Sequence, residues 1–396
     1  MTSAKRWLLP DGVEEILPAE AHKLETLRRQ LLDLYESWGY QLVITPLIEY
    51  LDSLLVGSSS DLDLDTFKIT DQLSGRTMGI RADITPQAAR IDAHCLNREG
   101  PVRLCYADNV LHTRPRGLMT SRVPIRIGAE FYGHSGVECD IELVCIMRET
   151  LQAVELSDVH IVLGHVGIFR TLLREANLDE DTERSLFEAV QRKAHDEIDE
   201  VLNSSEIDQK LRQMLLQLTR LSGDGTILKE AKKVFASAPA SVATELDELV
   251  AIADGVKKRL PEIVLCFDLC ELRGYEYHTG IVFAAYTPNY GRAVAKGGRY
   301  DHIGEVFGRA RPASGFDSDL KVLAKLSNKI FERKAAIIVP NNNDANLLEL
   351  VETLRRQGEI VVTWFGDAKL SRQDCAEQSC DRHIVNKNGV WIVESL

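Results

Sequence analysis

The sequence predicts an α+β fold in which helices flank a mostly antiparallel sheet, and three observations support this prediction. Strand-like runs dominate the chain from residue 41 to 164 and return after 262. Residues 166–258 instead carry long helical patterns with almost no β-branched runs. Near the C-terminus, strand and helix patterns alternate as in a small α/β domain. We therefore expect a large domain at 1–328, which contains a helical insertion at about 166–258, and a small domain at 329–396.

The large domain is expected to begin with an amphipathic helix and a hairpin. Leu24, Leu27 and Leu31 recur at helical spacing, and Gly39 follows them as a stop signal. A short strand then ends before Pro46. Two strands joined by a polar turn predict a hairpin over 66–80. After the hairpin we expect more strands and one helix, the strands at 102–106, 123–132 and 160–164 and the helix near 142–156.

The later elements follow from the same patterns. Inside the insertion, residues 183–203 and 207–221 are expected to be helical. Strand character returns at 263–272 and 281–285, and a loop of Gly, Tyr and Arg leads to Gly297–Asp301. In the small domain we expect a strand at 335–339, a helix at 347–356 and a second strand at 360–365. A hairpin follows at 384–393.

Composition limits the class of protein. Lys and Arg number 47 against 60 Asp and Glu, so the formal net charge is −13, and 44% of the residues are hydrophobic. This profile excludes wholesale disorder, and the acidic balance argues against broad electrostatic binding to nucleic acid. No apolar run approaches the ~20 residues of a membrane-spanning helix, and the first residues lack the apolar core of a secretion signal. We therefore expect a cytoplasmic protein that needs no membrane and whose eight cysteines are reduced.

Common signatures of enzymes and metal sites are missing. The sequence has no Gly-x-Gly-x-x-Gly, no phosphate-binding P-loop, no His-Glu-x-x-His and no Gly-x-Ser-x-Gly. It also lacks Cys-x-x-Cys, and its ten histidines are scattered. Structural zinc needs four ligands at suitable spacing, so we expect no metal site.

Three polar segments stand out as candidate sites, and the first follows the hairpin. Asp83 and Thr85 are two residues apart, so on a strand their side chains would share a face and could accept from an ammonium group. The alternative is an ordinary strand end whose polar side chains cap the following helix.

The second segment is rich in arginine. Arg114, Arg116, Arg122 and Arg126 fall within 13 residues, and arginine favours planar oxyanions such as phosphate and carboxylate. Glu130 follows at even spacing from Arg126, so the two are expected on one face of a strand. A solvated basic loop is the alternative for the first three arginines.

The third segment, Glu271–Gly280, lies between two apolar runs. It packs Arg273, Glu276, Tyr277 and His278 closely together. Burial of such groups without partners costs several kcal/mol each, so a core would not contain them at this density. We favour a binding site here.

Together, these segments resemble the histidyl-tRNA synthetase family, which has the class II aminoacyl-tRNA synthetase fold. The resemblance covers about residues 10–328. Arg273-Gly-Tyr-Glu-Tyr-His278 is close to the family's Arg-Gly-Leu-Asp-Tyr-Tyr, and Gly297–Asp301 matches its Gly-Gly-Arg-Tyr-Asp. The helix, Gly39 and the strand before Pro46 resemble the motif that builds the dimer interface in that class. The resemblance implies an antiparallel class II sheet flanked by helices.

The chain departs from the family where a synthetase holds ATP. Leu111 and Thr113 replace an arginine and a glutamate of motif 2, and Val322 replaces the arginine of motif 3. Asp317 and Asp319 add negative charge beside that position. Adenylation depends on positive groups that stabilise the developing charge, so we expect the reaction to be lost.

The resemblance implies that the amino-acid pocket is largely kept. In the family the matching positions hold the ammonium of histidine (Asp83, Thr85 and Glu130), lie near its carboxylate (Arg273) and surround its imidazole (Tyr277 and His278). Arg126 replaces a glutamine of the same pocket, which changes its charge.

A synthetase body that keeps this pocket and loses its ATP arginines resembles the regulatory subunits of ATP phosphoribosyltransferase. That resemblance implies a subunit without catalytic residues or a cofactor, with L-histidine as its ligand. It further implies homodimers within a hetero-octamer that contains the short-form catalytic subunit. Arg114, Arg116 and Arg122 are then candidates for contact with a phosphate or that partner. Residues 329–396 hold 9 Lys and Arg and 10 Asp and Glu, so tRNA binding is not expected.

Two alternatives remain open at this point. The chain could be a divergent histidyl-tRNA synthetase or a free-standing histidine-activating enzyme that uses Arg122 or Arg299 to hold ATP. A kinase regulator with a synthetase-like domain is less favoured, because the sequence has no kinase motifs.

Overall fold

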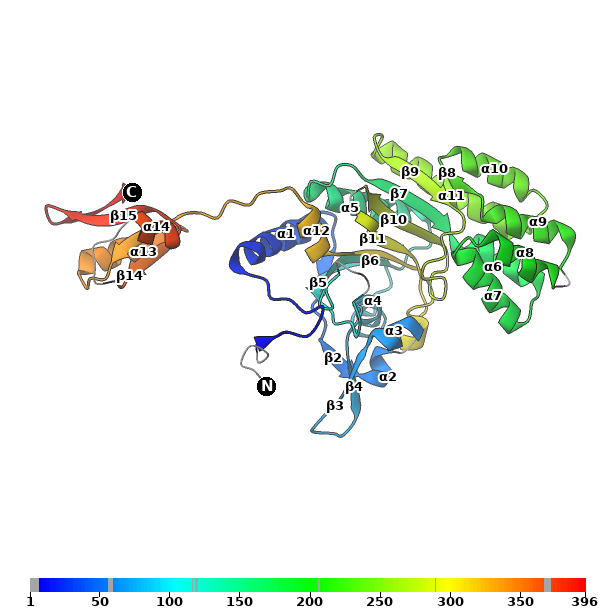
Figure 1. Ribbon diagram of the computed structural model, residues 1–396, viewed down its shortest axis with the longest axis horizontal. Coiled ribbons are helices and arrows are strands. Elements are labelled where there is room, and N and C mark those ends of the chain that lie inside the picture. The colour runs from blue at the N-terminus through cyan, green and yellow to red at the C-terminus, as the bar shows by residue number, and fades with distance from the viewer. Residues whose placement is uncertain are drawn as a thin grey trace. The chain divides into compact units, whose positions relative to one another are not determined.

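The computed structural model describes residues 7–55, 60–115, 117, 120–205, 207–288, 290–366 and 372–396 (Figure 1). The chain divides into two compact units, 1–329 and 330–396, one residue from the boundary expected from the sequence. Within the described residues, no helix is both long enough and apolar enough to cross a membrane.

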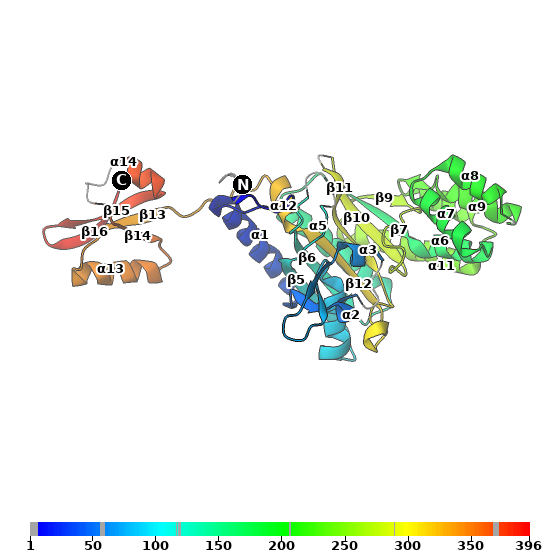
Figure 2. The same ribbon diagram turned by 60° about the horizontal axis from the view of Figure 1, so that its bottom comes forward.

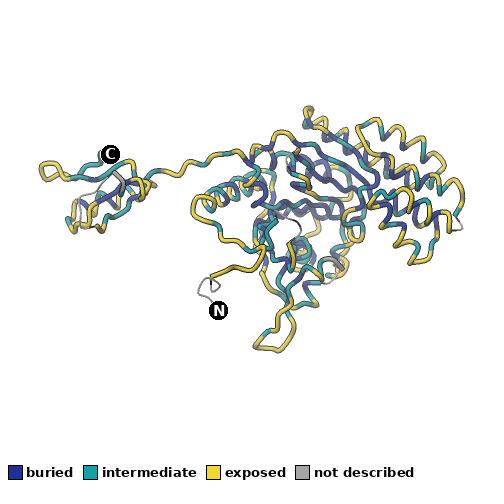
Figure 3. The backbone as a smooth tube through the Cα atoms, viewed as in Figure 1, coloured by how far each residue is buried: buried dark blue, intermediate teal, exposed yellow. Residues whose placement is uncertain are grey.

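A large, mostly antiparallel sheet forms the centre of the first unit, as predicted. Six adjacent strands, from β5 to β7 across the sheet, pair antiparallel. Strand β1 pairs in parallel with β5, and β9 pairs in parallel with β7 but antiparallel with β8. Buried residues concentrate on these central strands (Figure 3). The spatial order is β1 (Gln41–Leu42), β5 (Val102–Asn109), β6 (Ile125–Tyr132), β12 (Ala313–Asp319), β11 (Tyr290–Arg299), β10 (Ile281–Thr287), β7 (His160–His165), β9 (Val264–Asp268) and β8 (Ser222–Gly223).

Three of these strands, β8, β11 and β12, were not predicted. The segment interpreted as a loop of Gly, Tyr and Arg is largely strand β11, and β12 follows it after a turn region. Glycines hide the strand pattern because they have low β propensity. The fold requires them here: a Cβ at Gly297 would overlap the carbonyl of Gly315 and lie 2.7 Å from the ring of Phe283.

Helices cover one face of the sheet. The predicted amphipathic helix is α1 (Pro18–Ser37), and α5 (Val137–Ala153) starts five residues earlier than expected. The Tyr35 ring packs edge-on against Phe316 of β12, with 6.0 Å between ring centroids, and the Thr150 hydroxyl donates to Tyr35. Because successive strand residues point to opposite faces, Gly315 and Asp317 on either side of Phe316 face away from α1 and α5.

The opposite face carries the predicted hairpin and a short helix (Figure 2). Strands β3 (Phe67–Thr70) and β4 (Thr77–Ile80) pair as expected, and β2 (Ile48–Tyr50) joins them. The remaining pieces beside this small sheet are α2 (Leu51–Leu54), α3 (Ser60–Asp65), α4 (Thr85–Arg90) and a π-helical turn (Ile91–Leu96).

The insertion is helical, as predicted, but the pattern at 183–203 is split. Helix α7 ends at Gln191 and α8 starts at His195, because Lys193 adopts a left-handed backbone with φ of 53°. Aspartates cap two of the helices through their side chains, Asp179 for α7 and Asp208 for α9. The six helices are α6 (Val166–Ala176), α7 (Glu180–Gln191), α8 (His195–Asn203), α9 (Gln209–Leu218), α10 (Thr226–Val234) and α11 (Ala240–Arg259), and α12 (Leu320–Leu326) follows β12 later in the chain.

The second unit is a small α/β domain. Its sheet has the order β14, β13, β15, β16, and the helix α13 packs its apolar side chains against the core residues Ile337 and Ile384. Asn388 and Gly389 both have positive φ, which suits the tight turn of the predicted hairpin. Its elements are β13 (Ala336–Pro340), α13 (Ala345–Arg356), β14 (Val361–Trp364), α14 (Arg372–Glu377), β15 (Cys380–Lys387) and β16 (Val390–Ser395).

Candidate functional site

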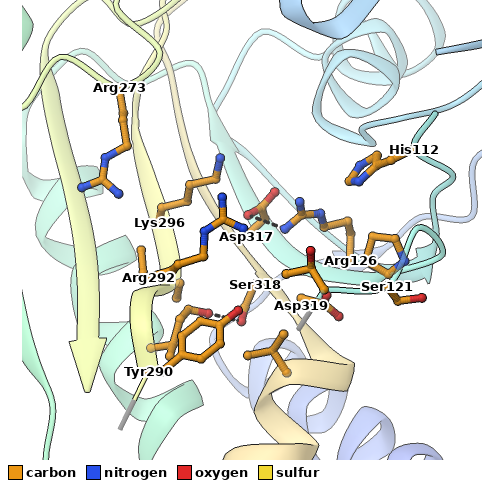
Figure 4. Close-up of a pocket in the computed structure, with 16 residues that line it drawn as sticks. His112, Ser121, Arg126, Arg273, Tyr290, Arg292, Lys296, Asp317, Ser318 and Asp319 are labelled. Carbon is orange, nitrogen blue, oxygen red and sulfur yellow. Dashed lines mark hydrogen bonds and ion pairs between the residues drawn. The ribbon is translucent and has the colours of Figure 1, made fainter. Parts of the chain in front are cut away.

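The face of the central sheet opposite α1 and α5 carries a cavity of about 210 Å³ (Figure 4). It lies over β6, β11 and β12, where charged side chains alternate with small ones. Its charged and aromatic lining residues are His112, Arg126, Arg273, Tyr290, Arg292, Lys296, Asp317 and Asp319.

The strand register places opposite charges side by side in this cavity. Lys296 of β11 pairs with Asp317 of β12, and Asp319 pairs with Arg126 of β6. The Arg126 Nη1 lies 3.4 Å from the Asp317 Oδ1, and the two side chains are only 13% and 11% exposed. Burial works against the charge on Arg126, but the carboxylates of Asp317, Asp83 and Asp319 outweigh it and raise the arginine's pKa. Burial also raises the pKa of Asp319.

Glu130 lies on the same face of β6 as Arg126, as the sequence predicts, and it is fully buried. Its Oε1 accepts hydrogen bonds from the Tyr106 hydroxyl at 2.9 Å and the Thr85 hydroxyl at 3.1 Å. Its Oε2 is buried and has no hydrogen-bond partner in the described part of the chain. Burial raises the pKa of Glu130 well above its usual range; the two hydrogen bonds offset part of this rise, and the charges of Asp83 and Asp317 add to it.

Asp83 and Thr85 reach this site, but not from a strand as predicted. Strand β4 ends at Ile80, and Thr85 is the first residue of α4, where Pro86 favours a helical start. The Asp83 Oδ1 accepts the backbone N–H groups of Ile84 at 2.6 Å and Thr85 at 3.0 Å. Asp83 thus holds the backbone just before the helix, but Ile84 is the N-cap residue and no side chain caps the helix, so the alternative role considered above is not found. Thr85 donates its hydroxyl to Glu130.

The third segment meets Glu130 through two glycines. Gly298 and Gly315 are cross-strand partners, and Gly315 pairs in turn with Glu130. A Cβ at Gly315 would overlap the Glu130 Oε2 and lie 2.5 Å from the Tyr300 hydroxyl oxygen. A Cβ at Gly298 would lie 2.7 Å from the His278 ring. The missing side chains therefore let Glu130, Tyr300 and His278 converge.

His278 is neutral in this setting. Burial lowers the pKa of His278 to about 4. Its Nδ1 lies 3.1 Å from the Arg299 carbonyl oxygen, which can only accept, so Nδ1 carries the proton. The Tyr277 ring, which is partly exposed, packs against His278 with 4.3 Å between centroids.

Arg273 lines the cavity but is already engaged. Its Nε donates to the Glu271 Oε1 at 2.8 Å, and its guanidinium also contacts the Tyr286 hydroxyl. These contacts, led by the hydrogen bond to Glu271, raise the pKa of Arg273. It lines the cavity together with Arg126 and Arg292.

Arg114 and Arg122 of the second segment do not line the cavity. Arg114 is exposed, and Arg116 lies outside the described residues. Arg122 donates to the backbone carbonyls of His112 at 3.1 Å and Asp11 at 3.2 Å. Their predicted contact with a phosphate or a partner stays a prediction.

Two tyrosines were missed by the sequence analysis. Tyr300 has a buried hydroxyl with no partner in the described structure, and its ring lies 6.2 Å from that of His278. It belongs to the matched Gly297–Asp301 motif, so the signal was present. Tyr106 lies in β5 between Cys105 and Ala107, outside the three polar segments that the sequence analysis singled out. Among the described residues, no three His, Cys, Asp or Glu side chains are grouped so that they could hold a metal ion.

Comparison with known proteins places this chain in a family. A model described as histidyl-tRNA synthetase matches residues 12–323, and one described as the ATP phosphoribosyltransferase subunit HisZ C-terminal domain matches 334–394. Relatives from Ectopseudomonas mendocina (strain ymp) and Azotobacter vinelandii (strain DJ / ATCC BAA-1303) are both 52% identical, over 100% of this chain and 100% of their own length. Both are named ATP phosphoribosyltransferase regulatory subunit. The chain belongs to this family of regulatory subunits.

Solved structures agree with this membership. A Bacillus halodurans C protein titled ATP phosphoribosyltransferase regulatory subunit/histidyl-tRNA synthetase has a TM-score of 0.83 and 26% identity, covering 97% of this chain and 99% of its own. Histidyl-tRNA synthetase from Nostoc sp. PCC 7120 has a TM-score of 0.78 at 20% identity, over 98% of this chain and 97% of its own, which shows the shared fold. The predicted class II fold is therefore confirmed.

Proposed function

We propose that this chain is the histidine-binding regulatory subunit of an ATP phosphoribosyltransferase and that it has no catalytic activity of its own. It acts in the cytoplasm, in the first step of histidine biosynthesis, and needs no cofactor. Its partner is the short-form catalytic subunit, which it activates and makes sensitive to feedback inhibition by L-histidine. The observation that carries the proposal is the buried Glu130, whose Oε2 has no described partner and lies, like the equally unpartnered Tyr300 hydroxyl, beside Gly315.

The acidic end of the site suits the nitrogen-bearing groups of histidine. A buried carboxyl oxygen without a donor is costly, and an ammonium or imidazole N–H would satisfy it. Following the resemblance, we assign Asp83, Thr85 and Glu130 to the ammonium, and Tyr277 with His278 to the imidazole. The arginines at the other end, Arg126 and Arg273, suit the carboxylate.

The cavity does not support adenylation. Adenylation needs fixed positive charge around the phosphates of ATP. The two family arginines are replaced by Leu111 and Val322, and Asp317 and Asp319 line the cavity in addition. Arg122 is held by backbone carbonyls, as described above. Arg299 turns to the opposite face of the sheet, where it pairs with Asp140 of α5.

Charge also argues against tRNA as a partner. The insertion, residues 166–258, holds 13 Lys and Arg against 18 Asp and Glu. A surface that binds a phosphate backbone is normally basic. The small C-terminal domain is no more basic, as its sequence already indicates.

An apolar surface next to α1 supports the proposed homodimer, which would sit within a hetero-octamer. The short edge strand β1 and the segment after it expose several large aliphatic side chains, and contiguous exposed apolar area favours a protein interface. These residues are Leu42, Ile44, Leu47 and Ile48, with exposed fractions of 48%, 78%, 50% and 43%.

The test is the ATP phosphoribosyltransferase rate of a purified short-form catalytic subunit, with and without this chain, across a histidine titration. We expect this chain to raise the rate and to confer inhibition by histidine. An unchanged rate and an unchanged response to histidine would overturn the proposal for that pair.

A further inference from the structure

The ion pair between Arg126 and Asp317 is poorly satisfied for its degree of burial. Charge-assisted N–H···O bonds are usually about 2.7–2.9 Å long, and Arg126 can donate five of them. Within the described structure, Arg126 instead makes one contact of 3.4 Å to the Asp317 Oδ1. Asp317 is as deeply buried as Arg126. The pair holds two desolvated charges with room for better partners.

Arg126 and Glu130 lie four positions apart on the same face of β6, which places a positive and a negative group over one stretch of the strand. Four residues of a strand span about 13 Å, and the side chains of Arg126 and Glu130 extend over the same face. The residue between them on this face is Gly128, where a Cβ would lie 2.8 Å from the Tyr106 hydroxyl. The missing side chain at Gly128 therefore leaves room for the Tyr106 hydroxyl, which donates to Glu130, between the two charged groups.

Arg126 and Asp317 compensate each other. The resemblance to synthetases puts a neutral glutamine at position 126, which needs no counter-ion. A buried arginine does need one, because an unpaired buried charge is costly. Asp317 supplies it from the neighbouring strand. Arg273, by contrast, already has Glu271 and Tyr286 as partners.

We propose that Arg126 binds the carboxylate of the bound amino acid, and that Asp317 is a positioning residue that holds Arg126 in the empty pocket and releases it to the ligand. This inference rests on the proposed function, which makes the ligand histidine. The exchange replaces one long contact by a closer pair with the ligand. Lys296, directly across from Asp317 on β11, lies beside the released carboxylate (Figure 4). Ligand binding therefore shifts the charge balance of the cavity.

Competition between Asp317 and the ligand can be measured with a matched pair of ligands. L-Histidine and histamine differ only in the carboxylate, so the ratio of their dissociation constants reports the carboxylate contact. We would measure this ratio by isothermal titration calorimetry for the full chain, for Asp317→Asn and for Arg126→Gln. Asp319→Asn is the control, because it removes the same charge from the residue directly across from Arg126, leaves the Arg126–Asp317 contact in place and can keep its cap on α12.

Asp317→Asn is expected to raise the preference for histidine over histamine about tenfold, equivalent to about 1.4 kcal/mol. Arg126→Gln should reduce the preference to near one, and Asp319→Asn should change it less than threefold. If Asp317→Asn leaves the preference for histidine over histamine unchanged, or lowers it, the proposed exchange is wrong. Should Arg126→Gln fail to fold, the result for Asp317→Asn alone decides. If the unaltered chain binds neither ligand, the proposed function fails as well. Binding of histidine with no effect of Asp317→Asn overturns only the inference.

Discussion

The two ends of the candidate site use charge in opposite ways. At the Glu130 end, one carboxyl is buried among the hydroxyls of Thr85, Tyr106 and Tyr300, and one of its oxygens has no described partner. At the cavity end, arginine and lysine side chains alternate with two aspartates that offset them. The first end is ready for a cationic group. The second has its positive charge balanced from within, which disfavours a triphosphate but leaves arginine available to a single carboxylate.

The largest effect expected from this difference is the absence of adenylation. Histidine-dependent exchange between ATP and pyrophosphate should be undetectable, because the cations that stabilise the transferred charge are missing. A histidyl-tRNA synthetase assayed in parallel is the positive control. Exchange by this chain that rises with histidine would contradict the account of the cavity end.

The next largest effect is expected at the other end. Glu130→Gln keeps the shape but removes the charge, so histidine affinity should fall by about 100-fold, the scale of a lost buried charged hydrogen bond. Calorimetry on the isolated chain measures this change. Glu276→Gln, an exposed change of the same kind, should leave affinity unaltered. Equal effects from both variants would remove Glu130 from the site.

A methyl group should close the Glu130 end sterically. Gly315→Ala places a Cβ onto the Glu130 Oε2 and beside the Tyr300 hydroxyl, so it should abolish measurable histidine binding and destabilise the fold by about 1–3 kcal/mol. Gly291→Ala is the control, since a Cβ there meets nothing within 4 Å. Thermal unfolding and calorimetry check both effects; unaltered binding by Gly315→Ala would show that the ligand lies elsewhere.

A smaller effect should appear in the dependence on pH. The Glu130 pKa is raised in the empty site by burial, and a bound cationic group favours the ionised carboxylate and lowers that pKa. Binding therefore releases protons from Glu130, and affinity rises as the pH increases towards the empty-site pKa. Titrations in buffers of different ionisation enthalpy count the protons, and Glu130→Gln should lose this release. Identical proton counts for the two proteins would contradict the prediction.

Several features of the fold and the site could be predicted from the sequence, because they depend on residues that are close together along the chain. The alternation of Arg126, Gly128 and Glu130 fixes their shared face, and strand β6 confirms it. The hairpin at β3 and β4 followed from its turn residues. These features depend on neighbours along the chain, which a sequence displays directly.

The rest depends on contacts between distant residues. Arg126 and Asp317 are 191 positions apart, so nothing local indicates their pairing. Strand β11 was missed because Gly297 and Gly298 lower its apparent strand propensity, although the close approach of Gly315 and His278 requires them. The split between α7 and α8 depends on the left-handed backbone of Lys193, a residue type that does not announce a break.

The most direct test of the central claim is histidine inhibition of the reconstituted ATP phosphoribosyltransferase complex that contains Glu130→Gln. The account predicts that this complex keeps the activation of the unaltered complex but needs far more histidine for half-inhibition, while Glu276→Gln behaves normally. Normal histidine inhibition with Glu130→Gln would show that histidine acts at a site other than this one.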